Sequence, residues 1–279
     1  MASATIAAIL HSSWIDLAAA GGIGLVVGAL AAASERSTNL RLSLEAISGL
    51  LATMLATLVG VFVAPLSLKA VVLSSLIVLL PGLTLTTAVR ELSTEHLVSG
   101  AARLAGAMAT LIKLAFGTVV ANQICHLLHL VPQIAEPAPV PAWAEWVALA
   151  CGCYAFAVLF RSARRDYPLV MAAVALGYVI SFSAGREFGP QFGVFLGGLC
   201  MGALGNVYAY VTKRPGSIVR VPGIILLVPG SVGFLSVSLI AQHDVFVGIN
   251  TAATLIGLLV CLVAGLLFGD LVFPARRVL

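Results

Sequence analysis

The sequence predicts an all-α, polytopic membrane protein, and three observations carry that prediction. Hydrophobic residues make up 61% of the chain and charged residues only 9%, a balance typical of proteins that face lipid. Several apolar runs approach the roughly 20 residues that a helix needs to cross a hydrocarbon core. Two of these runs are interrupted by the same dipeptide, at Pro81-Gly82 and at Pro229-Gly230. A β-barrel would instead show short segments of alternating polarity.

The two Pro-Gly segments are related by a constant offset. Pro229 lies 148 residues after Pro81 (229 − 81), and the same shift places Gly248 on Gly100 without a gap. An offset that is maintained over about forty residues indicates an internal duplication. Because proline removes a backbone hydrogen-bond donor, each Pro-Gly pair is expected to break a membrane helix part-way across.

Nine to ten spans are expected in chain order. They cover about 17–33, 44–64, 66–85, 97–125, 143–160, 169–183, 192–211, 219–240 and 245–268. The third and the eighth contain the Pro-Gly breaks. Residues 1–13 resemble the remnant of a tenth span, so residues 1–130 form a first five-span repeat with a truncated opening span. Residues 143–279 form the second five-span repeat.

The distribution of charge predicts the orientation of the spans. Residues 131–142 are rich in proline and lack Lys and Arg, so they are expected to be an external linker between the repeats. Basic residues gather at 161–165, at 213–220 and at Arg276-Arg277, which the positive-inside rule places in the cytoplasm with the C-terminus. Lys69, near the outer surface, is the exception. Spans paired by the 148-residue offset then run in opposite directions, as in inverted-topology repeats.

Inverted repeats with helices broken at matching positions are typical of secondary transporters. A broken helix frees backbone groups near mid-membrane, where half-helix N-termini can hold a carboxylate and free carbonyls an ammonium group or a coupling ion. The structural alternative is that Pro-Gly only kinks two spans for packing. The substrate-binding candidates are Pro81, Gly82, Thr84, Arg90, Glu91, Arg103, Pro229, Gly230, Ser231, Asn250 and Thr251.

Two acidic residues are candidates for proton coupling, because ionisable residues in or beside spans usually face a polar cavity. These are Glu91, which follows the first break, and Asp244, near the start of a span. Asp244 has a second interpretation as a helix cap. Arg90 and Glu91 have one as a solvated loop pair.

The sequence does not favour an enzyme, a cofactor protein or a nucleic-acid binder. It has no phosphate-binding loop, no His-Glu-x-x-His and no Gly-x-Ser-x-Gly motif. Cys151 and Cys153 are two residues apart and face different sides of a helix, which argues against a metal site. The net charge of +4 comes from loop residues, with no basic run interleaved with aromatic residues.

Two stretches resemble the threonine/serine exporter family of bacterial inner-membrane proteins. They are LLPGLTLTTAVRELSTEHLVSGAARL at Leu79–Leu104 and VPGIILLVPGSVG at Val221–Gly233, and the likeness extends from about Leu17 to Arg277. The resemblance implies about ten spans in two halves, and export of threonine, serine and related small molecules by the proton-motive force. Many members carry a soluble N-terminal domain ahead of the first span.

The sequence therefore predicts a proton-coupled secondary transporter that exports small polar amino acids across the bacterial inner membrane. Expected partners are the amino-acid substrate, protons, the lipid bilayer, a soluble N-terminal domain or partner subunit, and further copies of the chain through small-residue faces such as Gly21-Gly22. Two alternatives stay open. One is export of small dicarboxylates with Arg90 or Arg103 as the anion anchor, and the other is a non-transporting scaffold for a partner.

Overall fold

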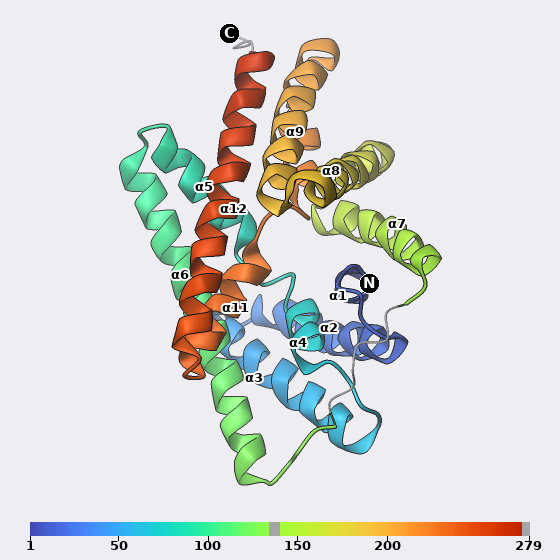
Figure 1. The fold of residues 1–279 in the computed structure, drawn as a ribbon, viewed down its shortest axis with the longest axis vertical. Coiled ribbons are helices and arrows are strands. Elements are labelled where there is room, and N and C mark those ends of the chain that lie inside the picture. Colours follow the sequence, from blue (N-terminus) through green and yellow to red (C-terminus); the bar gives the residue numbers. More distant parts are fainter. Residues whose placement is uncertain (134–139, 275–279) are drawn as a thin grey trace. The chain divides into compact units, whose positions relative to one another are not determined.

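The computed structural model describes residues 1–133 and 140–274, and within these ranges the regular structure is helical. Half of the predicted linker, residues 134–139, and the predicted cytoplasmic pair Arg276-Arg277 lie outside the described residues. The helices of the first half are α1 (Ala2–Ile9), α2 (Trp14–Ser34), α3 (Thr38–Phe62), α4 (Leu68–Ser75), α5 (Gly82–Ser93) and α6 (Leu97–Leu127). Those of the second half are α7 (Ala142–Leu159), η1 (Arg164–Asp166), α8 (Tyr167–Phe188), α9 (Pro190–Thr212), α10 (Ser217–Ile224), α11 (Gly230–Ala241) and α12 (Val245–Val272) (Figure 1).

Seven of the described helices are long and apolar enough to cross a membrane: α2, α3, α6, α7, α8, α9 and α12, the α8 segment being counted with η1. The protein is therefore a multi-pass helical membrane protein. The count of single long helices is below the nine to ten expected spans. The reason is that the third and eighth expected spans are each divided at Pro-Gly into two short helices, α4 with α5 and α10 with α11.

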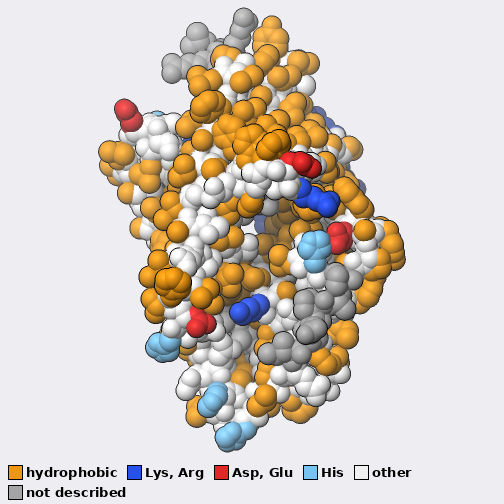
Figure 2. Space-filling view, in the orientation of Figure 1, with side chains coloured by type: hydrophobic (Ala, Val, Ile, Leu, Met, Phe, Trp, Pro, Cys, Tyr) orange, Lys and Arg blue, Asp and Glu red, His pale blue; other side chains and the backbone are white. Residues whose placement is uncertain are grey.

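The surface agrees with a lipid environment. Figure 2 shows hydrophobic side chains over most of the visible face, with charged side chains at few positions. Large apolar residues project outward, as Val98 and Phe246 do with 88% and 79% of their surface exposed. Apolar surface on this scale is unfavourable in water and favourable against lipid tails.

The described residues divide into two compact units, and each unit takes segments from both halves of the sequence. Unit 1 comprises Met1–Pro81, Met108–Gly152 and Ser231–Ala252, and unit 2 comprises Gly82–Ala107, Cys153–Gly230 and Ala253–Leu279. The chain passes from one unit to the other at both Pro-Gly breaks. The second half of each broken helix therefore belongs to the unit that the first half does not, with α5 in unit 2 and nearly all of α11 in unit 1.

In unit 1 a buried carboxylate fixes the start of two helices. Ser13 caps α2, where its Oγ accepts a hydrogen bond from the Asp16 amide at 3.2 Å and Asp16 Oδ2 accepts one from the Ser13 amide at 2.9 Å. This reciprocal pair is a capping box. The other oxygen of Asp16 accepts a hydrogen bond from the amide of Ser67, the N-cap residue of α4, at 2.8 Å. Asp16 thereby ties the first turn of α2 to the start of α4.

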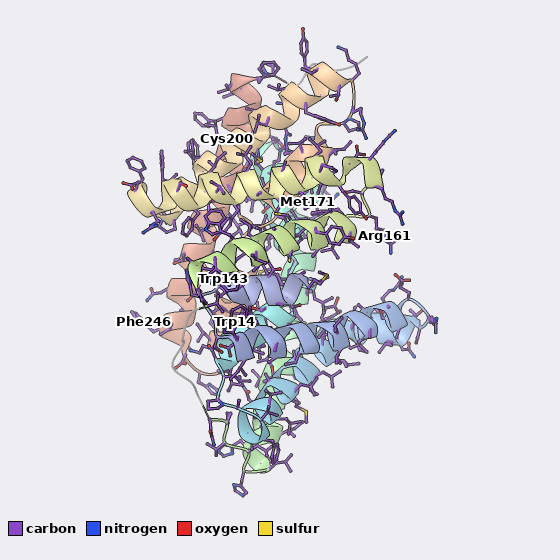
Figure 3. All side chains as sticks on the ribbon, turned by 90° about the vertical axis from the view of Figure 1, so that its right-hand side faces the viewer. Trp14, Trp143, Arg161, Met171, Cys200 and Phe246 are labelled. Atoms are coloured by element: carbon purple, nitrogen blue, oxygen red, sulfur yellow. The ribbon has the colours of Figure 1, made fainter. Side chains whose placement is uncertain are left out.

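Residues 1–13, the predicted remnant of a tenth span, contain the eight-residue α1 in unit 1. Ala8 of α1 forms a buried cluster with Val140 and Ala144 at the start of α7. Trp14 and Trp143, both labelled in Figure 3, pack with their ring centroids 6.1 Å apart.

In unit 2 the core lies between α9, α10 and α12. Its buried side chains include Met201 of α9, Ile224 of α10 and Leu262 of α12. The turn between α8 and α9 needs a glycine, because Gly189 has φ +94° and only glycine adopts such a backbone without strain. Pro190 then occupies the first turn of α9, where its missing N–H costs no hydrogen bond.

The sequence offset recurs in the helix bounds. α5 and α11 both have 12 residues and start 148 residues apart (230 − 82), while α4 and α10 both have 8 residues and start 149 apart (217 − 68). The difference of one residue falls in the break itself, which covers 76–81 in the first half and 225–229 in the second.

The offset also recurs in the packing. α2, α3 and α4 contact one another in unit 1, and α8, α9 and α10 do so in unit 2. A Cβ on Gly49 of α3 would run into the carbonyl of Leu114 in α6, and a Cβ on Gly198 of α9 would lie 2.8 Å from the carbonyl oxygen of Leu262 in α12. Each crossing is close enough that a side chain would not fit.

Candidate functional site

One glycine from each Pro-Gly pair, Gly82 and Gly230, belongs to unit 2, and the two glycines approach each other there. A Cβ on Gly82 would lie 2.5 Å from Val228 Cγ1 and 3.3 Å from both Cα and N of Gly230. Gly82 is the first residue of α5 and Gly230 the first of α11. The structure therefore brings together two half-helix starts that are separated by 148 residues in the sequence.

The backbone at the breaks is irregular. Gly230 N–H donates to the Val228 carbonyl at 2.9 Å, an acceptor only two residues back, and Leu227 N–H donates to Ile224 three residues back. The first amides of any helix have no acceptor inside that helix, and its N-terminus carries a partial positive charge. The start of α5 and the start of α11 can both attract a negatively charged group.

A cluster of charged and polar residues lies elsewhere in unit 2, centred on Asp270 of α12. Arg90 of α5 donates to Asp270 Oδ2 at 2.9 Å, and Arg220 of α10 donates to Asp270 Oδ1 and, at 2.7 Å, to Asn206 Oδ1. Asn206 of α9 donates to Asp270 Oδ1 at 2.8 Å. Four helices from both halves of the sequence are thus joined through one carboxylate. Two arginines against one aspartate leave the cluster with one net positive charge.

Glu91 and Arg103 form a second ion pair in unit 2. Arg103 Nε lies 2.9 Å from Glu91 Oε1, and the Arg103 side chain is 53% exposed. The pair links the end of α5 to the second turn of α6. The structure therefore pairs both members of Arg90-Glu91, but with different partners.

The predicted site residues divide between the two units. Unit 2 holds the residues of the breaks and of α5 together with the start of α6, namely Gly82, Thr84, Arg90, Glu91, Arg103, Pro229 and Gly230. Thr84 is exposed. Unit 1 holds Pro81, Ser231, Asp244, Asn250 and Thr251.

The unit 1 candidates at the start of α12 are Asp244, Asn250 and Thr251. Asp244 directly precedes α12 and is exposed, as is Asn250. Thr251 donates its hydroxyl to the Val247 carbonyl one turn earlier at 2.8 Å. The position of Asp244 is that of an N-cap residue, which was the second interpretation of this residue.

Unit 1 contains a cavity of about 480 Å³ that the sequence did not indicate. It is lined by residues of α3, the start of α4, α6 and α11. The polar lining comes from Thr53, Ser67, Lys69, Thr118, Asn122 and Ser238, together with Gln242 just beyond α11. Thr53 Oγ1 is buried without a hydrogen-bond partner. Among the described residues that line the cavity, Lys69 is the one with a charge.

Asp270, Arg220 and Asn206 were not among the predicted site residues. The available signal was the placement of Asp270 within the apolar run LLFGDLVF and of Arg220 between apolar neighbours, since charged residues in spans usually mark function. The cavity had no such signal, because its polar residues are ordinary Ser, Thr and Asn spread over four helices. No group of three or more His, Cys, Asp or Glu that could hold a metal ion occurs among the described residues.

Comparison with known proteins identifies the family. Residues 1–125 match the family described as "Putative threonine/serine exporter", and residues 145–272 match the family described as "Threonine/Serine exporter, ThrE". The chain belongs to the threonine/serine exporter family. The first match lies within residues 1–130 and the second within residues 143–279.

Curated relatives of this exporter-family chain include fungal membrane proteins. It is similar to pheromone-regulated membrane protein 10 of Candida albicans (28% identity over 251 residues), of Kluyveromyces lactis (23% over 249) and of Saccharomyces cerevisiae (23% over 249). Each alignment covers 87% of this chain, but 22%, 25% and 63% of the respective relative. The chain thus spans less than two thirds of the length of these relatives. No solved structure matches it.

Proposed function

We propose that this chain is a secondary-active transporter that exports small polar amino acids, threonine and serine foremost, in exchange for protons. The observation that carries the proposal is the approach of Gly82 to Gly230 in a chain of the threonine/serine exporter family. Two half-helix N-termini at one point form a site for the substrate carboxylate.

The proposed topology follows from the repeat. α4 with α5 makes one broken crossing and α10 with α11 another, which together with the seven long helices gives nine crossings. We place the linker outside and the C-terminus in the cytoplasm of a bacterial inner-membrane protein, on the basis of the basic loops. The two halves then have inverted topology. Arg161, labelled in Figure 3, belongs to one of the basic loops.

For proton coupling we favour Asp270 over Glu91 and Asp244. The Asp270 carboxylate binds Arg90 and Arg220 from two different broken helices, so its protonation would release both helices at once. Glu91 pairs with Arg103, whose side chain is 53% exposed, and Asp244 is exposed before α12. Protonation of Asp270 would therefore weaken the ion pairs that join α5 and α10 to α12.

The proposal is tested with purified chain in proteoliposomes. We expect labelled threonine to move when a pH gradient is imposed, and unlabelled serine to compete. If succinate competes and serine does not, the dicarboxylate alternative is correct, with Arg90 or Arg103 as anchor. If folded protein moves neither, but co-purifies stably with one partner, the scaffold alternative is favoured. A soluble N-terminal domain or partner subunit, and self-association, are tested by adding the domain back and by measuring oligomeric state.

The role of Asp270 has its own test. In Asp270→Asn the side chain keeps its shape and one acceptor oxygen, but it carries no charge and cannot take up the coupling proton. Its amide nitrogen cannot accept a hydrogen bond, so one of the contacts with Arg90 and Arg220 is lost. We expect this variant to retain exchange of internal for external threonine while losing the response to a pH gradient. Glu91→Gln is the matched control, and it should keep the response. Loss of the response in Glu91→Gln alone would assign the proton to Glu91.

A further inference from the structure

The cavity of unit 1 has the composition of a binding site. Its volume of about 480 Å³ falls in the range of roughly 300–1,000 Å³ that is typical of small-molecule pockets. Hydroxyl and amide groups line it along with apolar side chains, and such groups need water or a ligand as hydrogen-bond partners when protein does not supply them. Thr53 Oγ1 is buried among these residues without a partner.

Two helix ends give the cavity opposite electrostatic character at two places. Ser67, Leu68 and Lys69 are the N-cap and first two residues of α4. The Ser67 amide already donates to Asp16 Oδ1 at 2.8 Å, so the Lys69 ammonium, with the other first-turn amides of α4, is the group that favours a negative ligand there. Ser238 and Leu239 lie in the last turn of α11, which ends at Ala241. A helix C-terminus carries a partial negative charge and favours a cation.

The equivalent position in unit 2 is occupied by a charged cluster that includes a salt bridge. The sequence offset places Asn122 on Asp270 and Ser238 on Arg90. In unit 2 this pair is a salt bridge of 2.9 Å. In unit 1 both residues line the cavity instead, and neither has a charge. This position is therefore filled by a salt bridge in unit 2, whereas in unit 1 it is open to the cavity.

We propose that the unit 1 cavity binds a small zwitterion of the α-amino acid class, with the carboxylate at the start of α4 beside Lys69 and the ammonium group at the last turn of α11. This site is additional to the Pro-Gly breaks. The inference rests on the proposed function for the identity of the amino acid. Phe234, which also lines the cavity, lies about one turn after Gly230 on α11, so the cavity adjoins a broken helix.

The test reads occupancy of the cavity without measuring transport. The five native cysteines are replaced by alanine or serine, and S67C is introduced to place one thiol in the cavity lining. Its rate of alkylation by a small water-soluble reagent is measured in the absence and presence of threonine. We expect threonine to slow the labelling, and threoninol, which lacks the carboxylate, and 3-hydroxybutyrate, which lacks the ammonium group, to protect at least tenfold less well.

Lys69→Gln in the same background should raise the threonine concentration needed for protection about tenfold, and Lys69→Arg should restore it. The matched control is Lys113→Gln. Lys113 is also a lysine of unit 1, but it contacts the Leu42 carbonyl and lies 3.6 Å from Glu45 instead of lining the cavity. Protection that is equal in both glutamine variants would remove Lys69 from the site.

The outcomes separate this inference from the proposed function. Threonine flux without any protection of S67C overturns the cavity site and leaves the transporter standing. Protection by threonine without flux supports the site and contradicts transport by this chain alone. If 3-hydroxybutyrate protects as well as threonine, the site binds carboxylates and not zwitterions, which overturns the proposal. If alkylation of S67C is not detected even without ligand, a thiol at Asn122 in N122C serves as the second reporter.

Discussion

Unit 1 and unit 2 share a scaffold and differ in the chemistry placed on it. In both, three consecutive long and short helices contact one another, as α2, α3 and α4 in unit 1 and α8, α9 and α10 in unit 2. In both, glycines allow one helix to approach another closely, α3 to α6 in unit 1 and α9 to α12 in unit 2. The polar residues, however, are distributed differently. Unit 2 is held by a charged cluster and unit 1 contains a cavity with uncharged polar groups and one lysine.

The difference shows what the two units have in common at positions related by the 148-residue offset. Glycine occupies both positions at a close backbone approach, as at Gly117 and Gly265, because a side chain would separate the helices. The residue type differs at other positions, as Asn122 against Asp270 and Ser238 against Arg90 show. We infer that the two units share a scaffold but differ in role, with the lined cavity in unit 1 and, in unit 2, the charged cluster together with the approach of Gly82 to Gly230.

The largest predicted loss of stability is at Asp270 of unit 2, which differs in charge from its equivalent Asn122 of unit 1. Asp270→Leu leaves Arg90 and Arg220 facing each other without their shared carboxylate, and Arg220 is only 15% exposed. Removal of one partner of a largely buried charge cluster costs on the order of 3 kcal/mol. Asn122→Leu, at the equivalent place in unit 1, should change the free energy of unfolding little. Thermal unfolding in the same detergent measures both, and equal losses would contradict the division of roles.

An intermediate loss of stability is predicted at Gly117 and Gly265, where both units have a glycine at a close approach of two helices. A Cβ on Gly117 would run into the Ala46 carbonyl and a Cβ on Gly265 into the Phe195 carbonyl. Gly117→Ala and Gly265→Ala should each destabilise by about 2 kcal/mol, because well-packed interiors resist added atoms.

The control for this pair is Gly106→Ala in α6, where a Cβ meets nothing within 4 Å. It should be neutral or slightly stabilising, since alanine favours helix over glycine. If one of the two packed glycines tolerates alanine as Gly106 does, the shared packing is not essential in that unit.

The smallest predicted loss of stability is at Asp16 in unit 1 and Asp166 in unit 2, two carboxylates that bind a neighbouring segment at the start of a helix. Asp16 of unit 1 accepts backbone hydrogen bonds from Ser13 and Ser67 and is 1% exposed. Asp166 of unit 2 binds both terminal nitrogens of Arg214 at 2.7 Å. Asp16→Asn should cost about 1 kcal/mol through weakened hydrogen bonds, independently of salt.

Asp166→Asn should instead show a smaller loss that shrinks as salt rises. The screening length falls from about 10 Å at 0.1 M to about 3 Å at 1 M, so the wild-type ion pair loses value at high salt. Unfolding of both variants at the two salt concentrations distinguishes a hydrogen-bonded cap from an ion pair. The same salt response in both would remove the distinction.

Much of the fold could be predicted from the sequence, because apolar length and Pro-Gly interruptions are local signals. The bounds of α2, α6, α8, α9 and α12 contain the expected spans, and α3 ends two residues before the end of its expected span. The breaks at Pro81-Gly82 and Pro229-Gly230 lie at the starts of α5 and α11, as expected. The exchange of α5 and α11 between units was not predictable, since it depends on which surfaces pack after the break. The same is true of the approach of Gly82 to Gly230.

The candidate site was predicted in part. Arg90 and Glu91 were identified from their place after the first break, but their partners Asp270 and Arg103 lie 180 and 12 residues away. Distant pairing depends on tertiary packing, and neither spacing nor composition encodes it. The cavity of unit 1 is beyond sequence reasoning for a similar reason, because it is defined by space that four helices leave unfilled.

The central claim is that transport depends on the close approach of the two breaks, and one double-mutant cycle tests it most directly. A Cβ on Gly82 would meet Val228 Cγ1, so Gly82→Ala should lower gradient-driven threonine flux in proteoliposomes by on the order of tenfold or more. Val228→Ala alone should leave most of the flux intact. In the double variant Gly82→Ala/Val228→Ala, which removes the colliding methyl group, the account predicts recovery of flux. Wild-type flux in Gly82→Ala, or a folded wild-type protein that moves no threonine under a pH gradient, would contradict it.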